Sequence, residues 1–484
     1  MIIWDTPTSI RFKEDDAHKV ALMSAALTYT NKSVDYQIRQ LKKARWFDAV
    51  RHAERLEDLQ EVRRVCLLDN DGDTWVTYSG LAMDVDQILH QGIENHIVYP
   101  TAKLVPWAEV PPDLRPYQQE TVDLFLDKKH AAAEMATGLG KSYIILHLAK
   151  RLGLKTIIMA PTTSIADQLY ADFTRFLGKR CVGRFYGGKK ETEKLFTVAI
   201  HASLARIEKD SDAWKSLSQT LVFIADESHL TPAATLREVC FGLCATAPYR
   251  FFLSGTQLRA DGADLLLRGI TGPILKRMTV VDGVEQGYLA APRFRIFSAT
   301  SDDTYSTSDP LKMTQRHFYY NQAIIRKATA LANYAVTRMN HQVLIAIDEI
   351  EQFRDIVPHL TAQYKFASGP LTKDNLKYVP EAHRNGDNTK IVAEFNDGKF
   401  PILIGTSAIG MGTDIRPVKT IINLTAGKSE VQIRQLVGRG TRKVEGKDEC
   451  MVFDFDVVNV PMLHRHAQER IGIYADIFPD LEML

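Results

Sequence analysis

The sequence predicts an α/β protein with two parallel-sheet domains in tandem and a small α+β domain at the N-terminal end. The chain has 484 residues, which is enough for about three domains of ~150 residues each. After residue 110, two series of short apolar runs alternate with segments of helical pattern. This alternation is typical of buried parallel strands and their connecting helices. Hydrophobic residues make up 45% and charged residues 25% of the chain, so large cores can form without disulfides or a structural metal.

The N-terminal accessory domain is expected over residues 1–110. A long polar helix candidate occupies residues 34–64, and strand-like pieces follow at residues 64–68 and 74–78, joined by the turn-forming sequence DNDG. The proline-bearing stretch 106–112 indicates a linker to the next domain.

The two α/β domains are expected over residues 111–300 and 301–484, with a polar linker at residues 301–310. They are repeats of architecture and not of sequence. The apolar runs expected to form strands are residues 155–160, 196–200, 221–225 and 250–254 in the first of these domains, and 342–347, 401–405, 420–424 and 451–455 in the second.

Cysteine usage and hydropathy favour a cytoplasmic protein (host cytoplasm for a viral one). The five cysteines are scattered and odd in number, which suits a reducing compartment. Cys240 and Cys244 form a CxxxC pair without a second pair at zinc spacing, so we expect a buried helix face there and no metal site. No apolar stretch approaches 18 residues and the N-terminus lacks a signal-peptide pattern, so we expect no membrane contact. The net charge of +1 argues neither for nor against a nucleic-acid partner.

The strongest motif is ATGLGKS at residues 136–142, which follows an apolar strand candidate and opens a helix. This is the context of a phosphate-binding loop. The backbone of Thr137, Gly138 and Gly140 would wrap around phosphate, where N–H groups and the helix dipole favour an anion. Lys141 would reach the β- and γ-phosphates, and the Ser142 hydroxyl would ligate Mg²⁺. Met135 stands where the usual motif has its first glycine; the alternative is a capping turn with an incidental lysine.

An apolar run at residues 221–225 ends in two acids, Asp226 and Glu227, followed by Ser228 and His229. Ligands of open α/β sheets bind at the carboxyl ends of the strands. Asp226 would hold Mg²⁺, and Glu227 would polarise a water that attacks the γ-phosphate. His229 would relay to neighbouring polar groups. The alternative is a charged strand end that caps a helix.

With these segments the chain resembles superfamily 2 helicases of the DExH branch, over about residues 112–460. The further segments that carry the resemblance are LRPYQQE at 114–120, APTT at 160–163, SGT at 254–256, GTSAIGMGTD at 405–414 and QLVGRGTR at 435–442. The resemblance implies two tandem RecA-like P-loop NTPase lobes that bind ATP and Mg²⁺ and hydrolyse ATP. It also implies that Arg115 and Gln118 belong to the segment that reads adenine.

The last segment supplies candidate arginines for hydrolysis. Charge builds on the γ-phosphoryl oxygens during hydrolysis, and an arginine from another lobe stabilises it by ~10³–10⁵ in rate in well-studied cases. Arg439 and Arg442 are three residues apart, so we expect them to share a helix face, with Gln435 in the same catalytic segment. The alternative for each arginine is a surface salt bridge.

Other residues of these segments are candidate ligand contacts. Gly412 and Asp414 are expected at the nucleotide, with Asp414 near the ribose or the arginines. Thr163, Thr256 and Thr406 are candidate contacts to the nucleic-acid backbone. The alternative for the threonines is that they are β-branched residues at strand ends.

Two further stretches, residues 284–292 and 321–325, resemble those of XPB-like and phage UvsW-like helicases. This resemblance implies a monomeric, ATP-dependent DNA helicase or translocase that acts on forked or branched DNA, at junctions of single and double strands, in repair, recombination or replication. The alternatives are an RNA helicase, the motor subunit of a restriction-type system, and a binding module with an inactive ATP site.

The accessory domain offers one basic patch, formed by Arg39, Lys42, Lys43 and Arg45 at near-helical spacing. We expect it to hold duplex phosphates. The alternative is a solvated face, because acidic residues nearby balance its charge. The residues His52, His464, Arg465 and His466 form no recognisable ligand set, and we expect them at the surface or at helix ends.

Overall fold

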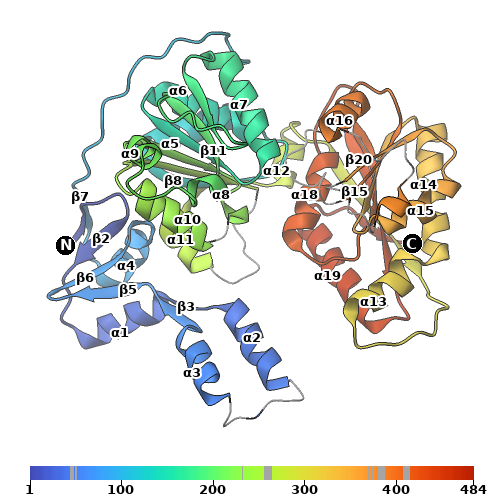
Figure 1. Cartoon of the computed structure of the whole chain (residues 1–484), viewed down its shortest axis with the longest axis horizontal. Helices are drawn as coiled ribbons and strands as arrows, with labels where there is room; N and C mark the ends of the chain where they lie inside the picture. The colour runs from blue at the N-terminus through green and yellow to red at the C-terminus, as the bar shows by residue number, and fades with distance from the viewer. Residues whose placement is uncertain are drawn as a thin grey trace. The chain divides into compact units, whose positions relative to one another are not determined.

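The computed structural model describes residues 1–43, 48, 52–231, 233–255, 264–368, 371, 375–379, 387–406 and 415–484. These residues form two compact units. The first contains Met1–Met135 and Gly140–Arg277, and the second contains Ala136–Leu139 and Met278–Leu484. Each unit has its own sheets and its own hydrophobic core (Figure 1).

The N-terminal part of the first unit is built on a five-stranded sheet in the order β5-β6-β2-β1-β7. Its strands are β1 (Ile2–Trp4), β2 (Ser9–Phe12), β5 (Leu68–Asp71), β6 (Thr74–Tyr78) and β7 (Ile93–Asn95). β1 and β7 are parallel and the other neighbours are antiparallel. Helices α1 (Ala17–Ala26) and α4 (Ala82–Leu89) bury Met23 and Val85 in the same core. The predicted α+β architecture of this part of the chain is therefore confirmed, and these residues belong to one compact unit with the first of the two seven-stranded sheets.

Residues 34–64 do not form the single long helix that the sequence predicts; that prediction was wrong. α2 (Lys32–Lys43) and α3 (Ala53–Glu61) contact each other, and in Figure 1 they lie side by side as an arm that extends away from the five-stranded sheet. α2 buries Val34, Ile38 and Leu41 on one face. A single helix would leave this apolar face in water, whereas folding back covers it. The strands β3 (Thr28–Thr30) and β4 (Arg64–Cys66) pair at the base of this helical arm.

The stretch between β7 and α5 (Pro116–Lys128), which includes the predicted linker, has neither helix nor strand. It is nevertheless tied to the helices beside it. The Lys103 N–H donates to the Leu152 carbonyl at the end of α6 (Lys141–Leu152), at 2.8 Å, and the Ala108 N–H donates to the Phe176 carbonyl in α7 (Thr163–Leu177), at 2.8 Å.

The rest of the first unit is a seven-stranded sheet in the order β10-β11-β9-β12-β13-β8-β14. Its pairings from β10 to β8 are parallel. All five residues of β12 are buried, as expected for a strand with helices on both faces of its sheet. The strands are β8 (His130–Met135), β9 (Thr156–Ala160), β10 (Val182–Phe185), β11 (Phe196–Ile200), β12 (Val222–Asp226), β13 (Tyr249–Ser254) and β14 (Ile274–Met278). The remaining helical segments are η1 (Ser79–Leu81), α8 (His201–Leu204), α9 (Asp212–Leu217), η2 (Ser228–Leu230), α10 (Ala233–Glu238), η3 (Val239–Leu243) and α11 (Asp264–Thr271).

The second unit is also built on a seven-stranded sheet, in the order β17-β18-β16-β19-β20-β15-β21, with parallel pairings throughout. Its strands are β15 (Ala291–Ala299), β16 (Gln342–Ile347), β17 (Tyr364–Ala367), β18 (Ile402–Gly405), β19 (Val418–Leu424), β20 (Glu449–Val457) and β21 (Leu481–Met483). Its helical segments are α12 (Val280–Glu285), α13 (Pro310–Thr314), η4 (Gln315–Tyr319), α14 (Gln322–Met339), α15 (Glu351–Ile356), η5 (Val357–His359), η6 (Leu376–Tyr378), α16 (Asn388–Asn396), α18 (Glu430–Gly440) and α19 (Pro461–Ile477). The prediction of two parallel α/β sheets is confirmed, and all eight predicted apolar runs fall on strands of these two sheets.

Cys240 lies in η3, the π-helical segment that follows α10, and Cys244 is the C-cap of that segment. Both are buried, as expected, but only Cys240 lies within the helix. The guanidinium of Arg250, itself buried, donates to the carbonyl oxygens of Cys240 and Cys244 at 2.9 and 2.5 Å. Among the described residues, no helix combines the length and the apolar character that a membrane span requires.

Candidate active site

The predicted phosphate loop connects β8 to α6 in the first unit. Gly138 and Gly140 have φ values of 95° and 76°, a region that L residues with a side chain rarely adopt. Gly140 also has no room for one, because a Cβ there would lie 2.6 Å from Gln118 Nε2. Met135 is the last residue of β8 and has no positive φ, so the absence of glycine at this position leaves the loop geometry intact.

Lys141, the first residue of α6, points back to the strand ends. Its Nζ lies 2.9 Å from Glu227 Oε1 and donates to the Met135 carbonyl at 3.2 Å. Both charged side chains are largely buried, with exposed fractions of 9% and 13%. Ser142 follows in the first turn of the same helix and is partly exposed. The structure therefore brings Lys141 and Glu227, predicted separately from the sequence, into direct contact.

The acidic pair lies at the carboxyl end of β12. Asp226 ends the strand, and its Oδ1 accepts from the Glu227 N–H at 3.0 Å. Glu227 has a φ of 46°, a left-handed conformation that costs about 1–3 kcal/mol for a residue with a side chain and often marks functional sites. Its Oε2 accepts from the Gly255 N–H at 2.9 Å, which helps to hold the carboxylate in this orientation.

His229 joins this acidic pair to the next strand. Its Nδ1 is hydrogen-bonded to Ser254 Oγ at the end of β13 and lies 3.5 Å from Glu227 Oε2. β12 and β13 are neighbours, with Asp226 beside Leu253. The relay that the sequence suggested for His229 thus has a structural path, which runs from Glu227 through His229 to the SGT segment.

The surroundings shift the pKa values of Asp226 and Glu227 in opposite directions. Burial, reinforced by the charge of Glu227, raises the pKa of Asp226 above its ordinary value. Burial would also raise the pKa of Glu227, but the charges of Lys141 and His229 and the hydrogen bonds that the carboxylate accepts outweigh it, so that pKa is lowered. A cation placed beside Asp226 would offset the cost of its buried charge. The site thus places an ammonium group, at the start of a helix, beside two largely buried carboxylates.

Gln118 lies directly at the phosphate loop. It is buried, its Oε1 accepts from the Arg115 N–H at 2.9 Å, and its Nε2 donates to the Gly140 carbonyl at 3.3 Å. Arg115 is the N-cap of α5 and donates to the Tyr117 hydroxyl at 3.2 Å. Thr163 begins α7 and is exposed, while its neighbour Thr162 caps the helix.

In the second unit, α18 carries Gln435 and Arg439 along one wall of a cavity of about 120 Å³. Thr406, at the end of β18, lines the same cavity, and Arg439 is buried. The cavity also receives side chains from the carboxyl end of β16 and from the loop between β19 and α18.

The expectation that Arg439 and Arg442 share a helix face was wrong. α18 ends at Gly440, and Arg442 instead forms an extended bridge with Leu289. The chain leaves the helix because the Thr441 carbonyl accepts from the Ala290 N–H at 2.8 Å, which pairs this segment with the start of β15.

Four predicted site residues, Thr256, Gly412, Asp414 and Arg45, lie outside the described residues. Thr137 and Gly138 belong to the four-residue segment that groups with the second unit.

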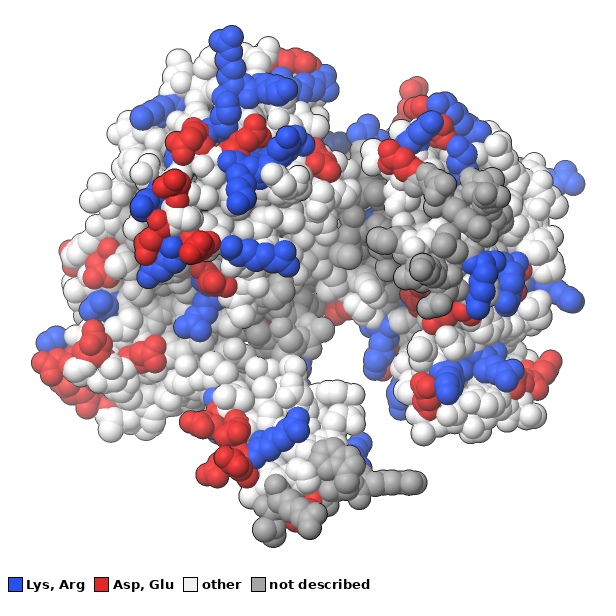
Figure 2. Space-filling model, in the orientation of Figure 1, with Lys and Arg blue, Asp and Glu red and all other residues white. Residues whose placement is uncertain are grey.

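In the predicted basic patch, Arg39 pairs with Asp35 at 2.6 Å, and Arg63 pairs with the same carboxylate at 2.8 Å. Lys42 and Lys43 are exposed in the last turn of α2. Figure 2 shows acidic and basic side chains interspersed on the face it displays, so among the coloured residues of that face no large area carries one sign. The basic patch is therefore small and partly neutralised.

The histidines at the chain's end have one partner that sequence reasoning missed. His464, in the first turn of α19, has its Nδ1 2.9 Å from both carboxylate oxygens of the buried Asp456. His52 is the N-cap of α3, so the expected helix-end positions are confirmed for these two residues. In the sequence, the one sign of the His464–Asp456 contact is that Asp456 follows the apolar run at residues 451–455.

Two families match separate parts of the chain. Residues 112–259 match the family described as "Type III restriction enzyme, res subunit", and residues 326–444 match the "Helicase conserved C-terminal domain".

Among curated relatives, the chain is 25% identical over 345 residues to "Probable helicase D10" of Escherichia phage T5, covering 70% of this chain and 70% of that protein. It is 22% identical over 356 residues to "DNA 3'-5' translocase XPB2" of Sulfurisphaera tokodaii, covering 68% of this chain and 79% of that protein.

Among solved structures, the chain is similar to the fragment of a putative HsdR subunit of a type I restriction enzyme from Vibrio vulnificus YJ016. The TM-score is 0.54 at 18% identity, covering 78% of this chain and 68% of that one, which supports the tandem RecA-like fold. T4 UvsW covers 100% of this chain and 98% of its own at 13% identity, with a TM-score of 0.45, too low to bear on the fold.

Proposed function

The chain is a superfamily 2 helicase, an ATP-dependent enzyme, and from that premise we propose that it is a motor that moves along DNA and acts on forked or branched DNA. The observation that carries the proposal is the pairing of Lys141 with Glu227 at the carboxyl edge of a parallel sheet, directly at the start of α6. We further propose the division into an accessory domain (1–110), a first RecA-like lobe (111–300) and a second one (301–484).

In this proposal Lys141 and the backbone of Thr137, Gly138 and Gly140 bind the phosphates, and Arg115 and Gln118 bind the adenine end. Bound Mg²⁺ would neutralise charge on the phosphates; Ser142 and Asp226 are the residues that would hold it. Gly412 and Asp414 are proposed as further nucleotide contacts.

Glu227 is proposed to orient and deprotonate the attacking water. The carboxylate now shares Lys141 with the Met135 carbonyl. Phosphate oxygens that recruit this ammonium would loosen its pairing with Glu227. Because Lys141 helps to lower the pKa of Glu227, the carboxylate would then become a stronger base when substrate is bound.

We propose that three residues of the second unit act on the γ-phosphoryl group during hydrolysis: Gln435, Arg439 and Arg442. A guanidinium beside the γ-phosphoryl group stabilises the charge that develops there. Residues of the second unit that act on a nucleotide held by the first would link hydrolysis to lobe movement, and this link is what a motor requires.

The choice of DNA over RNA is supported by two relatives that are named for DNA, XPB2 of Sulfurisphaera tokodaii and Rad25 of Halobacterium salinarum, against one named for RNA, L396 of Acanthamoeba polyphaga mimivirus. Thr163, Thr256 and Thr406 are the proposed contacts to the nucleic-acid backbone. The basic patch of Arg39, Lys42, Lys43 and Arg45 is proposed as a grip on duplex phosphates.

The grip can be tested by salt dependence. Lys42 and Lys43 are exposed, whereas Arg39 is already paired with Asp35. In the variant Lys42→Gln/Lys43→Gln, the plot of the log of the association constant for duplex DNA against the log of the salt concentration should have a slope that is flatter by about 0.9 per lost contact. Lys189→Gln/Lys190→Gln, which removes two exposed lysines outside the patch, is the matched control, with an unchanged slope expected. An unchanged slope in Lys42→Gln/Lys43→Gln would remove the patch from the binding surface.

The proposed substrate can be tested with labelled DNA. A fork, a four-way junction, a linear duplex and an RNA duplex are incubated with ATP and the products resolved on a gel. We expect conversion of the fork and the junction, and none with Lys141→Ala. Conversion of the RNA duplex alone would contradict the proposal.

A second candidate, a restriction-type motor that translocates along duplex DNA without separating its strands, is favoured by one observation. Residues 112–259 match the res-subunit family. Displacement of a third strand from a DNA triplex, without conversion of the fork or the junction, would favour this candidate.

A further inference from the structure

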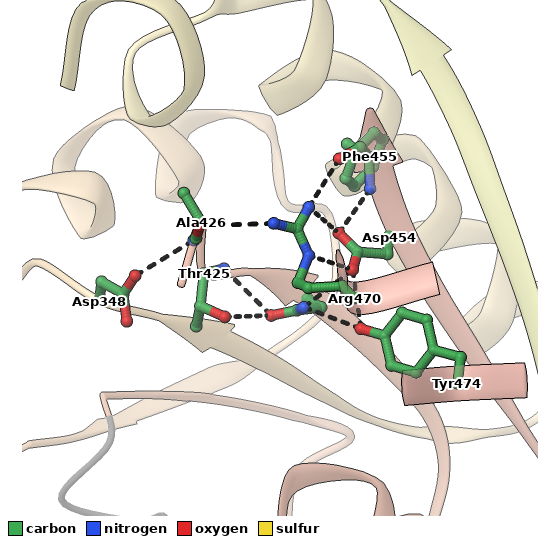
Figure 3. Close-up of polar contacts among 8 residues, drawn as sticks. Asp348, Thr425, Ala426, Asp454, Phe455, Arg470 and Tyr474 are labelled. Atoms are coloured by element: carbon green, nitrogen blue, oxygen red, sulfur yellow. Dashed lines mark hydrogen bonds and ion pairs between the residues drawn. The ribbon is translucent and has the colours of Figure 1, made fainter. Parts of the chain in front are cut away.

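A buried polar network lies in the second unit, away from the residues assigned to the reaction so far. Its centre is the carboxylate of Asp454, in β20, which Arg470 and Tyr474 contact (Figure 3). Asn423, in β19, is the fourth member. All four side chains are at most 2% exposed. We call these four residues the Asp454 network.

The Asp454 carboxylate is fully engaged. Arg470 donates to it through Nε at 2.8 Å and Nη2 at 3.1 Å, and the Tyr474 hydroxyl donates at 2.7 Å. Asn423 Nδ2 donates at 3.1 Å, and the Phe455 N–H donates at 2.7 Å. A buried charge pair needs this degree of satisfaction to be tolerated.

Stability alone is a weak reason for such a network. Removing two charges from water costs more than their attraction returns in many proteins, and apolar side chains of similar volume are often at least as stable. What a satisfied polar network supplies is a single geometry, since each donor and acceptor fixes the direction of its partner.

The network fixes the loop that connects β19 to α18. Asn423 Oδ1 accepts from the Thr425 N–H at 3.1 Å and from its hydroxyl at 2.6 Å. Arg470 Nη1 donates to the Ala426 carbonyl at 3.4 Å, and the Ala426 N–H donates to Asp348 Oδ2 at 3.2 Å. Figure 3 shows these contacts as one connected chain from Tyr474 to Asp348.

The same loop forms part of the cavity wall and leads into the helix of the last motif. Thr425 and Asp348 line the cavity, whereas the four members of the Asp454 network do not. The helix α18 begins at Glu430, four residues after Ala426, and carries Gln435 and Arg439 into that cavity. A shift of the loop would therefore move the start of this helix.

We propose that Asn423, Asp454, Arg470 and Tyr474 are positioning residues, which hold the β19–α18 loop so that Gln435 and Arg439 keep the orientation that ATP hydrolysis requires. This proposal rests on the proposed function of those two residues. The network acts through the loop and touches no substrate.

The test compares two buried asparagines of the second unit. Asn423→Ala removes the two contacts to Thr425 and also the donations from Asn423 Nδ2 to Asp454 and to the Tyr474 hydroxyl, at 3.1 Å each. Asp454 stays bonded to Arg470, Tyr474 and Phe455. Asn321→Ala is the matched control, because Asn321 is also buried (9% exposed, against 0% for Asn423) and caps α14, making four contacts that do not involve the loop. ATPase activity with saturating DNA and thermal unfolding are measured for both variants of the full chain.

We expect Asn423→Ala to lower kcat about tenfold with little change in KM for ATP, because Lys141 and Glu227, at the proposed phosphate site, lie in the first unit. Asn321→Ala should lower the melting temperature at unchanged kcat. Tyr474→Phe, which removes one hydroxyl and keeps the ring stacked on Phe294, should lower kcat by a smaller factor and serves if Asn423→Ala does not fold.

Unchanged kcat in folded Asn423→Ala and Tyr474→Phe would overturn the positioning role, as would equal losses of kcat in Asn321→Ala and Asn423→Ala. Wild type and Lys141→Ala are assayed alongside. If wild type lacks ATPase activity, or if Lys141→Ala retains it, the proposed function fails first, and the two failures are thus distinguishable.

Discussion

Replacing Glu227 by glutamine tests the proposed site most closely, because the change keeps the shape of the side chain and removes one charge. The amide oxygen can still accept from the Gly255 N–H, which now donates to Oε2 at 2.9 Å. The ion pair with Lys141 at 2.9 Å is lost. The variant therefore separates the positioning of this side chain from its action as a base.

The expected loss is large in rate and modest in stability. General base catalysis contributes about 10²–10⁴ in rate, so kcat should fall by that factor, equivalent to about 3–5.5 kcal/mol in the barrier. Breaking a buried ion pair can cost about 3–5 kcal/mol. Here the loss should lie near the lower end, because the charge of Glu227 raises the pKa of Asp226, and once that charge is gone Asp226 can ionise and balance Lys141.

The assay combines steady-state ATP hydrolysis with equilibrium binding of a fluorescent ATP analogue. Glu227→Gln should retain binding, since the loss of a negative charge and the release of Lys141 both favour phosphate. Lys141→Ala, the control, should lose both binding and hydrolysis. More than a tenth of the parent kcat in Glu227→Gln, or a loss of binding as large as the loss of rate, would refute the role given to this carboxylate.

Two further predictions concern stability. A Cβ on Gly440 would lie 2.3 Å from Cys450 Sγ, so Gly440→Ala should destabilise the second unit by about 1–3 kcal/mol. Gly472, in α19, has nothing within 4 Å of an added Cβ, so Gly472→Ala should stabilise the same unit by about 0.5–1 kcal/mol. Denaturant unfolding of both variants checks this pair of predictions, and equal effects would contradict it. Burial lowers the pKa of His130 to about 3, against ~6.5 in the unfolded chain. Between these two pH values the unfolded state binds a proton that the folded state excludes. The free energy of unfolding therefore falls as the pH drops below ~6.5, by about 1.4 kcal/mol per pH unit. His130→Phe should flatten the pH dependence of unfolding between pH 6.5 and pH 4, and parallel curves for variant and parent would show that His130 does not titrate in this way.

The predicted site residues that the structure brings together have local signals in the sequence. A glycine turn between an apolar run and a helix located Lys141, and an apolar run that ends in two acids located Asp226 and Glu227. Parallel strands place their carboxyl ends at one edge, so the proximity of these side chains followed from the fold class. The contact itself, between Lys141 and Glu227, required the structure.

The parts that the sequence did not predict depend on contacts between distant segments. The helical arm folds back because α2 needs cover for Val34, Ile38 and Leu41, and helical periodicity alone does not report where such a chain turns. Arg442 leaves the helix face because the chain after Gly440 pairs with residues near Leu289.

The Asp454 network had still less signal in the sequence. Asn423 and Asp454 look like ordinary polar residues within apolar runs, and Arg470 and Tyr474 lie on a helix that carries no motif. Their contacts form only when β19, β20 and α19 pack together.

The central claim is that this chain hydrolyses ATP at Lys141 and Glu227 in response to DNA. The rate of ATP hydrolysis, measured with no nucleic acid, with single-stranded DNA, with forked DNA and with RNA, tests it most directly. We expect strong stimulation by DNA, weaker stimulation by RNA, and no activity in Lys141→Ala. A hydrolysis rate that ignores nucleic acid, or that survives in Lys141→Ala, would contradict it.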